Sequence, residues 1–393
     1  MPAPILRPRG ETARVMPVEL FFDLVYVFAI TQLSHLLLAH LDMAGVAQTV
    51  LLTLAVWWAW MYTTWTTNYC DPDHPVLRLT LTGAMLAGLV MAAALPQAFG
   101  PRAMWFAGAY VALQVGRTLV VSIAARAHPI GVTFRLVLAY HVLSAVLWIA
   151  GAAIGGAAQG VLWAVALAVE YSGPWLGYRM PFLGRVTTTD WTIDGAHMAE
   201  RCQLFVIIAL GESLLVTGVS LADHPHLSAA AVAAFAVAFL GSVATWWVYF
   251  HRTAEAASET AAHVDDTGRL GRSAYTYIHI PMVAGIIVAA VGDELAIAHP
   301  FDRITAGAAL ALLGGPALFL AGHALFVRAV FGWVPVNRLV GIGVLAAAGL
   351  LAAVAPGLVP PLVLAAVATL VLGAVAATDG LRDRAPAQAG LAP

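Results

Sequence analysis

Long runs of apolar residues recur along the whole chain, separated by short stretches that hold most of the polar and charged residues. A helix of about 20 apolar residues is needed to cross a bilayer core, and the runs have this length. The pattern therefore predicts an all-α polytopic membrane protein with about twelve transmembrane helices. We place them at 17–40, 45–67, 78–99, 103–125, 134–155, 158–178, 199–221, 228–251, 273–292, 304–327, 335–355 and 359–378.

The composition supports a membrane protein. Of the 393 residues, 61% are hydrophobic and 10% are charged, and the mean hydropathy is +0.85, whereas soluble domains carry about 25% charged residues. The expected partner is therefore the lipid bilayer. A net charge of -2 without a long basic run argues against nucleic acid as a partner. Cys70 and Cys202 have no CxxC neighbour, so no disulfide framework and no cysteine metal site are expected.

The positions of the arginines indicate how the chain is oriented in the membrane, because basic residues are more frequent in cytoplasmic loops. The chain contains no lysine, so arginine alone is counted. With the N-terminus in the cytoplasm, only Arg102 and Arg303 fall on the outer side. This asymmetry predicts that both termini are cytoplasmic. The first apolar run is too long for a signal-peptide core, so it is expected to be an uncleaved span. We expect a cytoplasmic N-terminal segment at 1–16 and a disordered cytoplasmic tail at 379–393.

The two halves of the chain resemble each other. The segment VELFFDLVYVFAI lies over AERCQLFVIIALG at an offset of 181, and Gly88 lies over Gly285 at an offset of 197. The offset grows in chain order, as loop insertions would produce, although a bias toward Val, Ala and Leu is the alternative explanation. We predict parallel six-helix repeats at 17–178 and 199–378, joined by a cytoplasmic linker at 179–198.

Charged residues within apolar runs are the first candidates for a functional site, because they normally face protein or water. Glu19 and Asp23 are four residues apart and share a helix face. Glu212 lies near the middle of the seventh run. We interpret these acids as part of an ion, proton or substrate path at the interface of the repeats, with structural hydrogen bonds or ion pairs as the alternative. Arg117 is expected to pair with Asp23 or Glu19, or else to extend toward the interface.

Three further residues join the predicted path. Glu200 and Arg201 occur at the mouth of the seventh span, and His279 lies in the segment YTYIHIP just before Pro281. The proline predicts a kink, which often lines a cavity. A single membrane histidine is more often a packing group, and Glu170, within the sixth span, receives no specific role.

Aromatic residues cluster in the second, eighth and ninth spans. We predict an aromatic-walled cavity that holds a cation or an isoprenoid-like tail. The alternative is an aromatic belt at the membrane interface. The residues are Trp57, Trp58, Trp246, Trp247, Tyr275 and Tyr277.

Two segments carry a resemblance to a known family. The stretches VELFFDLVYVFAITQLSHLL and HMAERCQLFVIIALGESLL are similar to the signature segments of the bacterial low temperature requirement protein A (LtrA) family. The resemblance implies a multi-pass protein of the bacterial inner membrane, and it assigns no activity, because the family is named for a cold-growth phenotype. The family's polar signature falls on Glu19, Asp23, His197, Glu200, Arg201, Gly211 and Glu212.

Two functions remain open from the sequence. The first is a proton- or ion-coupled transporter or channel for an unknown ion or small solute. The second is a membrane-embedded enzyme that performs acid/base chemistry on a lipidic or isoprenoid substrate. No hydrolase, protease, nucleotide or dinucleotide motif is found, and no cofactor is expected. A scaffold role and a homodimer are also compatible with the sequence.

Overall fold

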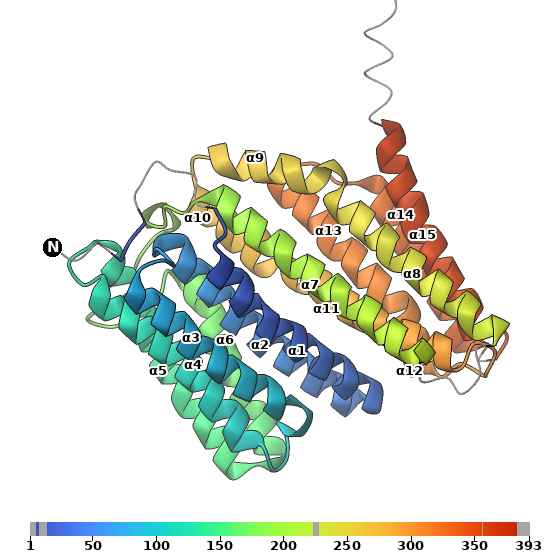
Figure 1. The fold of residues 1–393 in the computed structure, drawn as a ribbon, viewed down its shortest axis with the longest axis horizontal. Coiled ribbons are helices and arrows are strands. Elements are labelled where there is room, and N and C mark those ends of the chain that lie inside the picture. The colour runs from blue at the N-terminus through green and yellow to red at the C-terminus, as the bar shows by residue number, and fades with distance from the viewer. Residues whose placement is uncertain (1–4, 8–13, 223–227, 356, 383–393) are drawn as a thin grey trace, which may run out of the picture. The chain divides into compact units, whose positions relative to one another are not determined.

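The computed structural model describes residues 5–7, 14–222, 228–355 and 357–382, and this part of the chain is helical throughout, without a β-strand (Figure 1). The long helices follow the apolar runs of the sequence. They are α1 (Pro17–Ala39), α2 (Met43–Tyr69), α3 (Pro75–Ala94), α4 (Ala103–Ala124), α5 (Ile130–Ile154), α6 (Gly156–Leu176), α7 (Gly195–Ala222), α8 (Ala229–Tyr249), α11 (His279–Ala298), α13 (Gly315–Phe331), α14 (Val336–Val354) and α15 (Pro361–Arg382).

Eleven helical segments in the described part are long and apolar enough to cross a membrane. They agree with the predicted spans to within a few residues, except that the ninth begins earlier, at Thr267, and runs to Ala298. The sixth predicted span forms as α6, but it is not among the eleven. Its sequence includes Gln159, Glu170 and Pro174, which lower its apolar character. The described chain is thus a multi-pass, all-α protein.

Short elements interrupt or join the long helices. They are η1 (Leu95–Gln97), η2 (Thr188–Asp190), η3 (Phe250–Ala254), α9 (Glu255–His263), α10 (Thr267–Leu270), η4 (Gly271–Tyr277), α12 (Ala306–Ala309) and η5 (Leu310–Gly314). Among them η3, η4 and η5 are π-helical. The π-helical η4 comes directly before the segment where Pro281 predicted a kink. Helix α15 continues to Arg382, so only the last part of the predicted tail lies outside the described residues, as do residues 8–13 of the predicted N-terminal segment.

The chain divides into two compact units, each with its own core. The first unit comprises Met1–Phe205 and Ser258–Thr276. In it, helices α3 to α6 pack on one another in chain order, and α1 packs on α2 and α3. Helix α2 also contacts α4 and α6, so most of its residues from Leu52 to Asn68 are buried.

The second unit comprises Val206–Ala257 and Tyr277–Pro393. Helix α11 packs on α13, α8 on α15, and α14 on both α13 and α15. Glycines allow the close approach of α11 and α13, because a Cβ atom at Gly285 would lie 2.5 Å from the backbone nitrogen of Phe319. Small residues at a helix contact are typical of membrane proteins, in which packing rather than the hydrophobic effect holds helices together.

Candidate functional site

Asp23 is neutralised by Arg201 in the core of the first unit. Arg201 Nη1 donates to Asp23 Oδ2 at 2.7 Å, and Nη2 donates to Oδ1 at 2.8 Å. Trp60 Nε1 adds a third hydrogen bond to Oδ1 at 2.8 Å, and its ring lies 5.6 Å from the guanidinium carbon. The Arg201 side chain is completely buried. A bidentate pair of this kind fixes geometry as well as charge.

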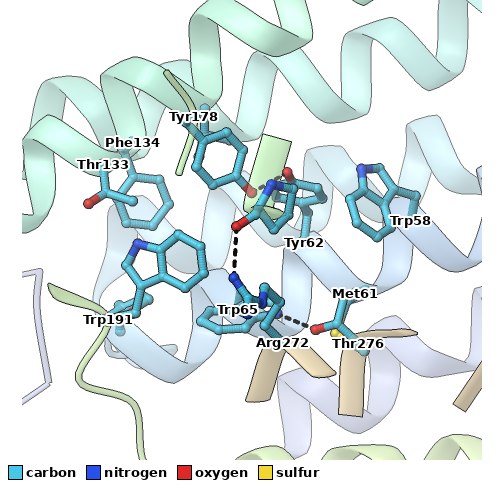
Figure 2. A pocket seen from close by; sticks show the side chains of 13 residues that line it. Trp58, Met61, Tyr62, Trp65, Thr133, Phe134, Tyr178, Trp191, Arg272 and Thr276 are labelled. Atoms are coloured by element: carbon cyan, nitrogen blue, oxygen red, sulfur yellow. Dashed lines mark hydrogen bonds between the residues drawn. The ribbon is translucent and has the colours of Figure 1, made fainter. Parts of the chain in front are cut away.

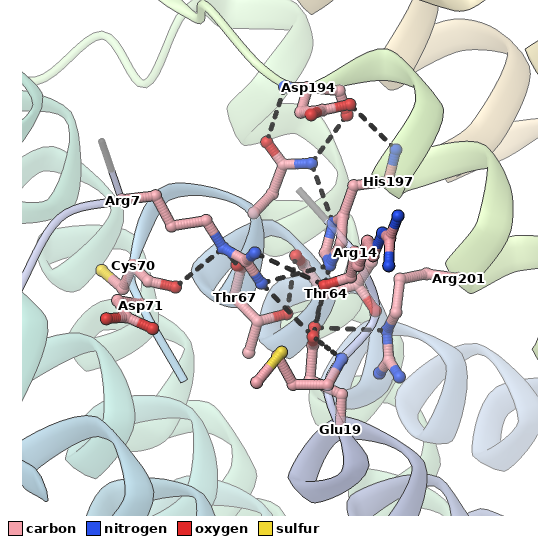
Figure 3. A network of polar contacts seen from close by, with 12 residues as sticks. Arg7, Arg14, Glu19, Thr64, Thr67, Cys70, Asp71, Asp194, His197 and Arg201 are labelled. Carbon is pink, nitrogen blue, oxygen red and sulfur yellow. Dashed lines mark hydrogen bonds and ion pairs between the residues drawn. The ribbon is translucent and has the colours of Figure 1, made fainter. Parts of the chain in front are cut away.

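Glu19 lies at the centre of a second group of contacts on the same helix face (Figure 3). Its Oε1 atom lies 3.0 Å from His197 Nε2 and 3.8 Å from Arg201 Nε. Its Oε2 atom accepts from the Met16 backbone at 2.9 Å and from Arg7 Nη2 at 3.3 Å. Arg7 is held there by the carbonyl oxygen of Thr67, at 2.8 Å from its Nε.

The tautomer of His197 follows from its neighbours. The Asp194 backbone N–H donates to Asn68 Oδ1 at 2.9 Å, which leaves the amide nitrogen to face His197 Nδ1 at 3.1 Å. Because an amide nitrogen only donates, Nδ1 accepts and the ring proton sits on Nε2, where it donates to Glu19. His197 is therefore neutral in this arrangement.

The charges of this cluster cancel. Glu19 and Asp23 bring two negative charges, and Arg7 and Arg201 bring two positive charges, while His197 is neutral. Every one of these side chains except that of Arg7 is at most 2% exposed. Removing one member would leave a buried charge uncompensated. The cluster joins α1, α2 and the start of α7 within the first unit, and it has the properties of a structural clamp.

Arg117 does not pair with an acid, so the predicted ion pair with Asp23 or Glu19 is wrong. Its Nη1 donates to Thr63 Oγ1 at 2.8 Å and to the Ala59 carbonyl at 3.1 Å, and its Nη2 donates to Gln114 Oε1 at 2.6 Å. The guanidinium also lies 5.6 Å from the centre of the Tyr62 ring. Neutral acceptors and an aromatic face replace the expected carboxylate.

A chain of hydrogen bonds leads from Arg117 to Glu170. Because the guanidinium occupies Gln114 Oε1, the Gln114 amide nitrogen faces the Tyr110 hydroxyl at 3.3 Å and donates to it. Tyr110 then donates its proton to Glu170 Oε2 at 2.5 Å. Every link donates in the same direction, toward Glu170. We call Arg117, Gln114, Tyr110 and Glu170 the polar chain.

Two further donors reach the other oxygen of Glu170. Ser144 Oγ lies 2.6 Å and Trp148 Nε1 lies 3.1 Å from Oε1. The Ser144 hydroxyl also lies 3.1 Å from the carbonyl oxygen of His141, a second acceptor for the same proton. Glu170 itself is 1% exposed. The sequence showed an acid in the sixth span but not these partners, which come from two other helices, α4 and α5.

An aromatic pocket opens in the first unit (Figure 2). It holds about 540 Å³ of space between protein atoms, including its mouth. Trp58 and Tyr62 of α2 line it, with Tyr178 and Trp191 from the segment after α6 and Arg272 of η4. Its lining residues include no Asp, Glu or His. Small-molecule sites are usually lined mostly by apolar and aromatic side chains, as this pocket is.

Tyr62 belongs to both features. Its ring faces the pocket, and its hydroxyl lies 2.5 Å from that of Tyr178, which also lines the pocket. On its other side, Tyr62 contacts the Arg117 guanidinium and the ring of His141, whose centre is 4.6 Å away. The pocket and the polar chain are therefore separated by a single side chain.

The other predicted residues of the first unit are neither members of the polar chain nor lining residues of the pocket. Glu200 is exposed on α7. Trp57 is buried and donates to the Thr276 carbonyl at 2.8 Å. Tyr275 is buried, and its carbonyl lies 3.9 Å from Cys202 Sγ.

Glu212, His279, Tyr277, Trp246 and Trp247 belong to the second unit. Glu212 is 2% exposed, and His279 is buried with its Nε2 atom 2.9 Å from the Tyr249 hydroxyl. Tyr277 is half-buried. Trp246 and Trp247 are 43% and 44% exposed on α8 and do not line the aromatic pocket, so only Trp58 of the predicted cavity residues does.

Asp293 is an acid that the sequence interpretation missed. It lies in α11 and lines a smaller pocket of the second unit together with Ser213, Ser242, Thr245 and Thr369. Its carboxylate has no hydrogen-bond or ion-pair partner among the described residues. The available signal was the pair of acids in VGDELAIA, which we placed just beyond the end of the ninth span.

Comparison with known proteins agrees with the resemblance in the sequence. The family model described as bacterial low temperature requirement A protein (LtrA) matches residues 14–377. An uncharacterized protein of Rhizobium meliloti (strain 1021) is 40% identical over 333 residues, which cover 84% of this chain and 81% of that protein. No solved structure matches the chain.

Proposed function

The chain belongs to the bacterial low temperature requirement A (LtrA) family of membrane proteins, and from this premise we propose that it is a proton-coupled transporter of a small solute. The observation that carries the proposal is Glu170, a carboxyl group buried among helices whose partners satisfy it both with and without a proton. Intramembrane acids of this kind are typical of proton-coupled carriers.

The two states of Glu170 differ in the position of one serine proton. When Glu170 is ionised, Tyr110, Trp148 and Ser144 all donate to it. When Glu170 is protonated, it donates to Ser144 Oγ, and the serine proton turns to the His141 carbonyl at 3.1 Å. In both states the Glu170 carboxyl group and the Ser144 hydroxyl keep hydrogen-bond partners, so proton binding at Glu170 does not add an unpaired group.

The position of the polar chain links the proton to a solute. Tyr62 lies between the aromatic pocket and the Arg117 end of the polar chain, so a solute that moves the Tyr62 ring changes the surroundings of the Arg117 guanidinium. The Arg117 guanidinium is connected to Glu170 through the hydrogen bonds of Gln114 and Tyr110. Binding in the pocket and protonation of Glu170 are thereby coupled.

We assign Glu19 and Asp23 to the structural clamp rather than to the proton path. Asp23 is matched by Arg201, and Glu19 by Arg7, so protonation of either acid would break a buried ion pair. The alternative of an enzyme with acid/base chemistry receives less support, because the aromatic pocket has no carboxyl or imidazole group in its lining.

The proposal includes the predicted orientation in a bacterial inner membrane. With twelve spans, α6 among them, and two parallel repeats at 17–178 and 199–378, both termini face the cytoplasm. The aromatic pocket, at the end of α2 and the beginning of α5, then lies on the cytoplasmic side. The supporting observation is the distribution of arginine, which leaves only Arg102 and Arg303 outside.

Proton flux into proteoliposomes tests the proposal. Purified protein is reconstituted with a pH-sensitive dye inside, a potassium-diffusion potential is imposed, and a panel of organic anions, organic cations, amino acids and sugars is added in turn. We expect one class of solute to drive proton entry in the wild type, and Glu170→Gln to abolish this coupled flux. Glu259→Gln removes an exposed acid outside the polar chain and serves as the matched control. Equal coupled flux in Glu170→Gln and wild type, or no coupled flux with any solute, would overturn the proposal.

A further inference from the structure

We propose that the aromatic pocket binds an amphipathic organic anion: a carboxylate or phosphate head on an aromatic or acyl body, with the head on Arg272 and Trp191. This inference deepens the proposed function by naming the class of solute for its pocket.

The lining of the aromatic pocket favours a ligand whose main part is apolar. Ten of the thirteen lining residues are buried, and Trp65, Tyr69 and Arg272 are the three that are half-buried and mark the mouth. Most of the lining is aromatic or aliphatic, and the Tyr62 and Tyr178 hydroxyls are directed at each other across 2.5 Å. Flat rings and methylene chains both gain from burial against such a surface.

Arg272 gives the pocket its positive charge. Its Nη1 atom donates to the Pro174 carbonyl at 3.3 Å, and its guanidinium carbon lies 4.2 Å from the centre of the Trp175 ring. Its Nε atom is buried without a hydrogen-bond partner. No carboxylate of the described chain lies within ion-pair distance of Arg272, so its charge is available to a ligand.

Trp191 supplies a second donor. Its ring is 3% exposed and lines the pocket, and its Nε1 atom is buried without a partner. Trp65 provides the contrast, because its Nε1 donates to Thr276 Oγ1 at 2.9 Å. An unpaired buried N–H is costly, and an anionic oxygen would satisfy it.

The charge and the N–H donors of the pocket disfavour a cation as its ligand. Aromatic cages commonly hold cations, but here the only charged lining residue is an arginine, which would repel one. The free polar atoms are N–H donors, and the lining provides no carboxylate. A neutral apolar molecule would fit the walls but would leave both donors unpaired.

Equilibrium binding with matched charge variants of one ring system tests the inference. The full chain is placed in phosphatidylcholine nanodiscs, and binding of 1-naphthoate, 1-naphthamide and 1-naphthylmethylamine is measured by calorimetry without any gradient. We expect saturable binding of naphthoate, binding of the amide that is weaker by about tenfold or more, and no binding of the amine, since a charged hydrogen bond contributes at least a factor of this size.

Substitutions at Arg272 and Trp191 test whether these residues bind the head group. Arg272→Gln is expected to weaken naphthoate by about tenfold or more and to remove the preference over the amide. Arg269→Gln, three residues earlier and 67% exposed, is the matched control and should bind as the wild type does. Trp191→Phe keeps the ring and removes the N–H, so it should weaken the acid more than the amide. Circular dichroism and gel filtration establish that each variant is folded. If Arg272→Gln does not fold, Trp191→Phe still tests the inference.

A second arm distinguishes a free solute from a lipid. Decanoate and phosphatidic acid compete with naphthoate, and native mass spectrometry detects lipid that remains on the purified chain. An anionic lipid retained by the wild type and lost in Arg272→Gln supports the inference with a lipid as its source. Binding of the acid, amide and amine with equal affinity, or no saturable binding of either naphthoate or decanoate, would overturn it. Binding is measured without proton flux, so its failure is separate from a failure of the transport proposal.

Discussion

The ion pair of Asp23 and Arg201 yields the most direct stability prediction. In Asp23→Asn the amide oxygen keeps the Trp60 hydrogen bond, but the amide nitrogen faces an Arg201 nitrogen that stood 2.7 Å from the carboxylate. Two donors then oppose each other, and the guanidinium keeps only Glu19 at 3.8 Å as a counter-charge. Breaking one side of a buried pair costs about 3–5 kcal/mol, which lowers the folding equilibrium constant by more than about a hundredfold.

The chain contains a matched control for this substitution. Asp73 forms an ion pair of 2.6 Å with Arg78, but the two side chains are 54% and 57% exposed. Asp73→Asn makes the same chemical change in water, so its expected cost is about 0–1 kcal/mol. The difference between the two variants isolates the effect of burial.

The assay is reversible unfolding in mixed micelles with increasing dodecyl sulfate, followed by helical circular dichroism. A double variant, Asp23→Leu with Arg201→Met, removes both charges and should recover most of the lost stability. The reasoning is wrong if Asp23→Asn unfolds within about 1 kcal/mol of the wild type, which is the range of an exposed pair, or if the double variant is no more stable than Asp23→Asn.

Three further outcomes are expected. Burial raises the pKa of the Cys70 thiol to about 12, so a maleimide should not label it at pH 7 in the folded chain but should label it after unfolding. Gly285→Ala forces a Cβ atom to 2.5 Å from backbone and should cost about 1–3 kcal/mol, whereas Gly343→Ala meets no atom within 4 Å and should not lower the dodecyl sulfate midpoint. Hydrogen bonds from the Thr187 backbone and hydroxyl lower the pKa of Asp190. The stability that the ionised Asp190 adds to the turn is therefore fully present above the ordinary aspartate pKa and is lost as the pH falls through the lowered pKa. Limited proteolysis at this turn should increase at acid pH in the wild type and show no such change in Asp190→Asn.

The long helices were predictable because each coincides with a long and largely apolar run in the sequence. Helix α1 was expected at 17–40 and is found at Pro17–Ala39. Helix α9 was missed, because the polar and alanine-rich segment EAASETAAH has no such run. The interruption by η4 was indicated only indirectly, through Pro281, because a π-helical turn depends on packing as well as on local sequence.

The burial of Glu19 and Asp23 also followed from the sequence, since two acids one turn apart in an apolar helix must find partners. The identity of those partners could not be predicted from the sequence. Asp23 pairs with Arg201, which is 178 residues away, and this pairing depends on which helices pack together. The predicted partner of Arg117 was wrong for a different reason. Amide, hydroxyl and carbonyl oxygens can all accept hydrogen bonds from a guanidinium, and because these groups are uncharged they cannot be recognised in a sequence as partners of an arginine.

The composition of the polar chain limits the kind of proton movement that the proposed function allows. A guanidinium does not release its proton under physiological conditions, and an amide does not pass protons along, so Arg117 and Gln114 close one end of the route to Glu170. A continuous proton current through these residues is therefore not expected. If the chain carries protons as proposed, each proton reaches and leaves Glu170 from the Ser144 side, which is the behaviour of a stoichiometric carrier and not of an open pore.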